Sequence, residues 1–191
     1  SEIHMTNHQP ISLQIRADGP LMAAGNSDLR SLLLDLECAA SEISTPPAPI
    51  AVVLALDVST SMSGAKIDSV REAAVQVVAQ LKDQDLLGLV IFHHSAELLM
   101  PLVAMNEAGR LSATRVILGL SVEGNTALSE GWRISAEELA RALPSLPGRN
   151  LQVVILSDGQ GNEGVTAPGA LAELAAGAST RGVSTSSIGV G

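Results

Sequence analysis

The apolar run Ile50–Leu56 ends directly at Asp57, and Ser59 and Ser61 follow at alternate positions. A run of this length with almost no polar residue predicts a strand that is buried on both faces, as in a parallel sheet covered by helices. The aspartate and the two serines therefore stand where a buried strand ends, and their oxygens can turn toward one point. Hard divalent cations prefer oxygen ligands of this kind.

From residue 50 onward, strand-length apolar runs alternate with stretches of helical periodicity. Strands are predicted at 50–57, 86–93, 96–102, 151–156 and 183–190, and helices at 66–82, 107–118, 128–143 and 168–181. The strand at 96–102 is expected to pair back on its predecessor as a hairpin. The alternation predicts an α/β fold with a doubly wound, mostly parallel central sheet flanked by helices.

The first part of the chain has a different pattern. Residues 11–15 alternate apolar and polar side chains, and 32–40 do so again, which predicts a short antiparallel β appendage. The proline-rich stretch 45–49 is expected to be a rigid connector, since proline cannot continue a strand. We therefore divide the chain into 1–10, a tag remnant and loose N-terminus; 11–49, the appendage and connector; and 50–191, the main domain.

Composition excludes several classes of function. The net charge is −9, with one Phe, one Trp and no Tyr, which disfavours phosphate contacts and base stacking, so no nucleic-acid partner is expected. No apolar run approaches the roughly 18 residues of a membrane span. The N-terminus has no secretory pattern, and Cys38 is the single cysteine, so a cytoplasmic location is predicted.

Polar residues follow three of the predicted elements at what should be one edge of the sheet. They are Asp57–Ser61 after the first buried strand, Glu123–Thr126 before a helix, and Ser157–Gly159 after another buried strand. Ligands of such sheets bind at the carboxyl ends of the strands. Magnesium suits these hydroxyls and carboxylates, whereas zinc or copper would prefer cysteine or histidine ligands, which these loops lack.

Each loop also has a simpler interpretation. Ser59 or Ser61 could cap the following helix, and Thr126 could cap another. Asp158 and Gly159 could form an ordinary turn. Each of these alternatives is at least as plausible when taken singly, but the placement of all three loops at the same edge favours a shared site.

The motifs Asp57-x-Ser59-x-Ser61, Gly-Asn-Thr126 and Ser-Asp158-Gly together resemble the metal-ion-dependent adhesion site of von Willebrand factor type A domains. The resemblance covers residues 50–191. It includes Asp85–Phe92, an acidic residue followed by a strand that ends in Phe. The chain is most similar to bacterial stand-alone versions, in which a short β segment precedes a Rossmann-like domain.

The resemblance implies a role for each motif residue. Ser59, Ser61 and Thr126 would supply hydroxyl ligands, and Asp57 and Asp158 would bind the ion directly or through water. The ion would be Mg²⁺, or else Mn²⁺ or Ca²⁺, with one position left for an Asp or Glu carboxylate of a partner protein. The expected function is therefore a metal-dependent protein-binding module with an adaptor or assembly role, and not an enzyme.

The sequence departs from the family in two places. His93 and His94 follow Phe92 where the family often has small polar or acidic residues, and we interpret them as surface imidazoles. The sequence stops at Gly191, where family members usually continue with a further helix and strand. From this we expect a truncated fragment, a homo-oligomer or a partner chain that completes the C-terminal side.

Two other functions compete with the binding module. A phosphoryl hydrolase could use Asp57 as nucleophile, but Ser59 stands where such enzymes carry a second carboxylate, and no lysine is assigned to hold phosphate. A non-ATPase subunit of an ATP-driven, chelatase-like or remodelling complex is the stronger alternative. This chain has no phosphate-binding Gly-Lys-Ser/Thr loop, and the glycine-rich stretch 159–164 is interpreted as a flexible loop.

Overall fold

A computed structural model describes residues 11–17, 32–38, 47–159 and 168–190. The chain divides into two compact units, Ser1–Pro47 and Ala48–Gly191. In the first unit, β1 (Ile11–Ala17) and β2 (Leu32–Cys38) pair antiparallel, with Leu13 opposite Leu36. The predicted antiparallel appendage is thereby confirmed. The expected tag remnant at 1–10 and most of the glycine-rich loop lie outside the described residues.

The second unit is built on a five-stranded sheet with the order β5-β4-β3-β6-β7. Its strands are β3 (Ile50–Asp57), β4 (Leu86–Phe92), β5 (Ala96–Ala104), β6 (Asn150–Ser157) and β7 (Val183–Gly189). All neighbours pair parallel except β5, which returns antiparallel along β4. The predicted doubly wound, mostly parallel sheet with one hairpin strand is confirmed.

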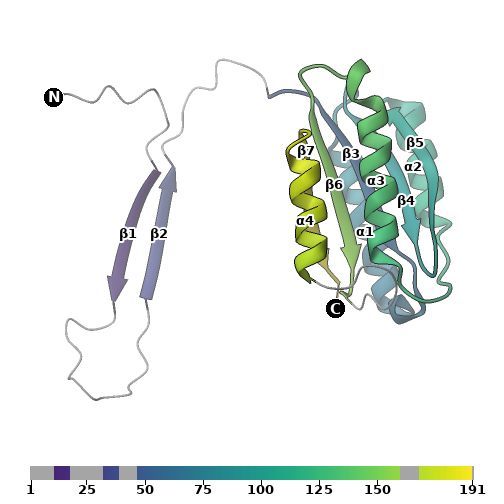
Figure 1. Cartoon of the computed structure of the whole chain (residues 1–191), viewed down its shortest axis with the longest axis horizontal. Coiled ribbons are helices and arrows are strands. Elements are labelled where there is room, and N and C mark those ends of the chain that lie inside the picture. Colours follow the sequence, from purple (N-terminus) through teal and green to yellow (C-terminus); the bar gives the residue numbers. More distant parts are fainter. Residues whose placement is uncertain (1–10, 18–31, 39–46, 160–167, 191) are drawn as a thin grey trace. The chain divides into compact units, whose positions relative to one another are not determined.

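Helices cover both faces of this sheet (Figure 1). They are α1 (Ala65–Gln80), α2 (Glu107–Leu118), α3 (Leu128–Ala142) and α4 (Pro168–Ser179). In Figure 1, α3 and α4 lie on the near face of the sheet, and α1 lies on the far face. The third helix ends one residue earlier than predicted, because the chain tightens into a 3₁₀ turn at Leu143–Ser145, which contains Pro144.

The core consists of two apolar layers separated by the sheet. Alternate residues of β3 face opposite sides, so that Leu54 and Leu56 pack with α1 and α2, while Val53 and Ala55 pack with α3. Residues 51–57 of β3 are all buried. This burial explains the continuous apolar run in the sequence, since neither face of a central strand meets water.

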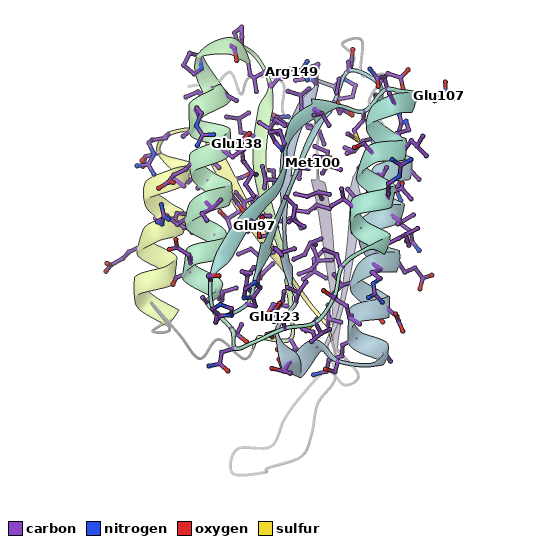
Figure 2. All side chains as sticks on the ribbon, turned by 90° about the vertical axis from the view of Figure 1, so that its right-hand side faces the viewer. Glu97, Met100, Glu107, Glu123, Glu138 and Arg149 are labelled. Atoms are coloured by element: carbon purple, nitrogen blue, oxygen red, sulfur yellow. The ribbon has the colours of Figure 1, made fainter. Side chains whose placement is uncertain are left out.

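The strand order reverses beside β3, which places a switch point at its carboxyl end. From β3 the sheet continues to β4 on one side and to β6 on the other. Open α/β sheets bind ligands in the crevice at such a point. Figure 2 shows Glu123 at this end of the unit and Arg149 at the opposite end.

Among the described residues, every helix falls short of a membrane span in length, in apolar character or in both.

Candidate metal centre

Asp57 organises the candidate site from the last position of β3. Its side chain is fully buried, and each carboxylate oxygen accepts a hydrogen bond. The backbone N–H of Ser59 donates to Oδ1 at 2.9 Å, and the hydroxyl of Ser157 donates to Oδ2 at 2.6 Å. Because the two donors come from different segments, the orientation of the carboxylate is fixed from both sides.

Ser59 and Ser61 lie side by side in the turn that follows Asp57. Their hydroxyl oxygens are 3.0 Å apart, and Ser59 is buried. A short 3₁₀ helix, Thr60–Met62, closes this turn, and Ser59 makes no side-chain cap on it. The cap of α1 is Gly64, so capping does not account for either serine.

The loop that carries Thr126 is bound directly to the Asp57 turn. The N–H of Glu123 donates to the carbonyl of Val58 at 2.7 Å, and the N–H of Thr60 donates to the carbonyl of Gly124 at 2.9 Å. The Thr60 hydroxyl donates to the same Gly124 carbonyl. These bonds hold 123–126 against the exit of β3.

Thr126 itself is buried and does not cap the following helix. The cap position of α3 belongs to Ala127, which makes no side-chain cap. The N–H of Ala127 donates to the carbonyl of His93 at 2.5 Å, which ties the loop to the end of β4 as well. The buried hydroxyl of Thr126 therefore lies in a loop that is anchored at both of its ends.

The two histidines contact each other and the same loop. Their Nδ1 atoms are 2.8 Å apart, and His94 lies so close to Gly124 that a Cβ there would fall 2.7 Å from its ring nitrogen. Gly124 also has a φ of 67°, a backbone conformation that favours glycine. Beyond being surface imidazoles, the pair therefore packs against the Thr126 loop.

Asp158 follows β6 and carries an ion pair. Its side chain is 3% exposed, and Lys66 Nζ lies 2.8 Å from Oδ2. The preceding residue, Ser157, is fixed by three contacts: its hydroxyl bonds Asp57 and the N–H of Gly159, and its carbonyl accepts from Val190. The β6 loop is therefore attached to β3, α1 and the end of β7.

Two residues of this centre were not assigned from the sequence. Ser157 stands beside Asp57 because β3 and β6 are neighbours, with Leu56 opposite Leu156. Lys66 reaches the site from the first turn of α1, 92 residues away from Asp158. The position of Lys66 in the first turn of a helix that starts at the carboxyl edge of the sheet could have indicated that it lies near the site. Only the pairing of the strands, however, determines which carboxylate Lys66 reaches.

The donor set fits a hard cation. The five predicted residues contribute carboxylate and hydroxyl oxygens, and the three loops that carry them are bonded to one another or to neighbouring strands at one sheet edge. Within the part of the chain that the structure describes, no group of three or more His, Cys, Asp or Glu side chains could hold a metal. A site here would therefore depend on hydroxyls, which suit a hard divalent cation better than a soft metal.

A hollow of about 230 Å³ opens beside this centre. Leu128, Ile155, Asp158 and Ile188 contribute to its lining, and Ile188 is 49% exposed. An acidic residue with an apolar rim therefore borders the candidate site on the β7 side.

Known proteins resemble this chain in sequence and in fold. The sequence profile of the von Willebrand factor type A domain matches residues 52–160. The E3 ubiquitin-protein ligase WAV3 of Arabidopsis thaliana is 32% identical over 154 residues, covering 79% of this chain and 19% of that protein. Inter-alpha-trypsin inhibitor heavy chain H1 of Sus scrofa is 32% identical over 119 residues, covering 60% of this chain and 13% of that protein.

Among solved structures, proximal thread matrix protein 1 from the mussel byssus, with a zinc-occupied MIDAS motif, shares the fold. Its TM-score is 0.60 at 17% identity, over 75% of this chain and 38% of that one. The chain thus spans less than a fifth of the length of either curated relative named above.

Proposed function

Because this chain belongs to the von Willebrand factor type A family, we propose that it is a protein-binding module whose contact with its partner runs through a divalent cation. Ser59, Ser61 and Thr126 would hold the ion together with Asp57 and Asp158. The ion would be Mg²⁺, with Mn²⁺ or Ca²⁺ as substitutes. The observation that carries the proposal is the double hydrogen bonding of Asp57, which connects the serine turn to β6.

The charges at the site favour an acidic partner. The two carboxylates supply two negative charges, and Lys66 offsets one of them in the ion pair with Asp158. A divalent cation added to this group leaves an excess of positive charge, which attracts a further carboxylate. The partner is therefore expected to present an Asp or Glu side chain, and the module would serve as an adaptor in an assembly.

The geometry disfavours a phosphoryl hydrolase. A nucleophilic aspartate must expose an oxygen to the substrate, whereas Asp57 is fully buried and both of its oxygens accept hydrogen bonds. Lys66 is a lysine at the site, as such an enzyme needs, but it is paired with Asp158. We therefore propose a binding module without catalysis. A metal-dependent phosphatase activity that Asp57→Asn abolishes would reverse this choice.

Thermal unfolding with Mg²⁺ or Mn²⁺ against EDTA tests the site. The ion should raise the melting temperature of the wild-type chain, because it binds the folded state alone. Asp57→Ala should remove this response, while Asp83→Ala, at a carboxylate that is 83% exposed, should keep it. A metal-induced rise in melting temperature that persists in Asp57→Ala would contradict the proposed site.

A pull-down compared with and without EDTA tests the partner. Retention of a protein in Mg²⁺ and its release by EDTA from the wild-type chain, with no retention by Asp57→Ala, is the expected result. A bound ATPase would favour the alternative role as the non-ATPase subunit of an ATP-driven complex.

A further inference from the structure

Lys66 and Asp158 form an ion pair at the edge of the candidate site. The ammonium is 2.8 Å from Asp158 Oδ2, and the exposed fractions of the two side chains are 34% and 3%. Burying a carboxylate without a compensating charge is unfavourable. Lys66 therefore compensates the charge that a metal ion would otherwise compensate.

We propose that Lys66 is an internal counter-ion of Asp158 that competes with the divalent cation and weakens its binding. This inference rests on the proposed metal site. In the metal-free chain the ammonium keeps Asp158 in place and offsets the repulsion between the two carboxylates. When the cation binds, it shares the Asp158 carboxylate with the ammonium, so the ion pair with Lys66 weakens and the two positive charges repel each other.

The expected size of this effect follows from elementary electrostatics. A unit positive charge about 6 Å from a divalent ion opposes binding by about tenfold even at the dielectric constant of water. Because the Lys66 side chain is 34% exposed, we take this solvent value of about tenfold as the expected size of the effect. Replacing Lys66 with an uncharged residue should therefore tighten metal binding.

A supporting role for Lys66 predicts the opposite change in metal affinity. If Lys66 served mainly to orient Asp158 toward the ion, its removal would leave a mobile carboxylate and weaken metal binding. The direction of the change thus decides between competition and support.

The sequence supplies a matched control, since Lys66 and Lys82 are its two lysines. Lys82 lies at the other end of the sheet: its backbone N–H donates to Asp85 Oδ2 at 2.7 Å, and Asp85 Oδ1 accepts from Ile50 at the start of β3 at 3.0 Å. The length of β3, about 3.3 Å per residue, separates it from the candidate site.

Metal titration of three variants tests the proposal. The dissociation constants of Mg²⁺ and Mn²⁺ are measured by calorimetry and by the shift in melting temperature. Lys66→Met should bind about tenfold more tightly than the wild-type chain, while Lys66→Arg, which keeps the charge, and Lys82→Met should stay within about twofold. Unchanged or weaker binding by Lys66→Met overturns the competition.

A labelling measurement on the wild-type chain does not depend on the folding of any variant. Acylation of lysines by an amine-reactive reagent is followed by mass spectrometry in EDTA and in Mg²⁺. Lys66 should become more reactive in Mg²⁺, and Lys82 should not change. A Lys66 reactivity that Mg²⁺ leaves unchanged or lowers overturns the proposal. Absence of any metal response in the wild-type chain overturns the metal site together with this role, whereas a normal wild-type response with the wrong sign in Lys66→Met overturns this role alone.

Discussion

The hydroxyl of Ser157 donates a hydrogen bond of 2.6 Å to Asp57 Oδ2 across a sequence separation of 100 residues. The bond joins the ends of two neighbouring parallel strands. The other oxygen of Asp57 accepts a hydrogen bond from the backbone N–H of Ser59. The carboxylate therefore links the end of β6 to the turn that carries Ser59 and Ser61. Protein contacts from two segments therefore fix the orientation of the Asp57 carboxylate in the candidate site.

Ser157→Ala should destabilise the metal-free chain by about 1–3 kcal/mol, because it leaves a buried carboxylate oxygen without its donor. Urea unfolding in EDTA measures this free energy. Ser112→Ala, an exposed change in α2, is the matched control and should stay within about 0.5 kcal/mol of the wild-type chain. Equal stabilities of the two variants would show that the bond contributes nothing.

Thr126→Val should separate metal binding from folding. Valine keeps the shape of threonine but lacks the hydroxyl, so the melting temperature in EDTA should change little while the Mg²⁺-induced increase is lost. Thr114→Val in α2 serves as control and should keep the increase. A full Mg²⁺ response in Thr126→Val would remove this hydroxyl from the ligand set.

Gly124→Ala should loosen the loop that carries Thr126. Gly124 has a φ of 67°, and the new Cβ would lie 2.7 Å from His94 Nδ1, so strain and a close contact add up to a cost of about 1–3 kcal/mol. Gly148→Ala has the same kind of backbone, with a φ of 73°, but nothing within 4 Å. Amide hydrogen exchange of residues 121–127 measures the loosening.

The double variant His94→Ala with Gly124→Ala isolates the contact. Removing the imidazole should restore part of the stability that Gly124→Ala loses, because the contact with the ring is then gone while the backbone strain remains. If the double variant regains no stability, the whole loss in Gly124→Ala comes from the backbone conformation at residue 124.

Glu130 in α3 should make a small, pH-dependent contribution to stability. Its hydrogen bonds with Arg133 hold the pKa of the carboxyl below its ordinary value of 4.5, against a smaller opposing effect of burial. The lowered pKa means that the contribution is complete above pH 4.5 and is lost as the pH falls through the folded-state value. The side chains of the pair are 49% and 42% exposed, so screening limits the contribution to about 0.5 kcal/mol.

Urea unfolding of Glu130→Gln at pH 7 and at pH 3 checks this sign. The variant should be slightly less stable than the wild-type chain at pH 7, and the difference should shrink at pH 3. For Glu97→Gln, on the exposed side of β5, the difference in stability from the wild-type chain should not shrink between pH 7 and pH 3. A gap that widens at low pH would contradict the assignment.

Much of the fold follows from local patterns in the sequence. The continuous apolar run of β3 indicates burial on both faces, and the apolar stripe of α1 indicates a helix packed on a sheet. Boundaries were harder to predict: β5 continues to Ala104, two residues past its predicted end, because its pairing with β4 extends to Leu86. Cross-strand pairing is a tertiary property, so a local pattern does not reveal where it stops.

The motif residues of the candidate site could be read from the sequence, because chain order places them at the ends of strands or starts of helices on one sheet edge. Their supporting contacts could not. Ser157 supports Asp57 only because β6 pairs with β3, and Lys66 compensates Asp158 only because α1 begins beside the end of β6. The sequence alone determined the strands, the helices and the oxygen-bearing loops, since these depend on local periodicity and on residue type. The tertiary structure alone decided which charges and hydroxyls meet, since strand order and helix packing bring together residues about 100 positions apart.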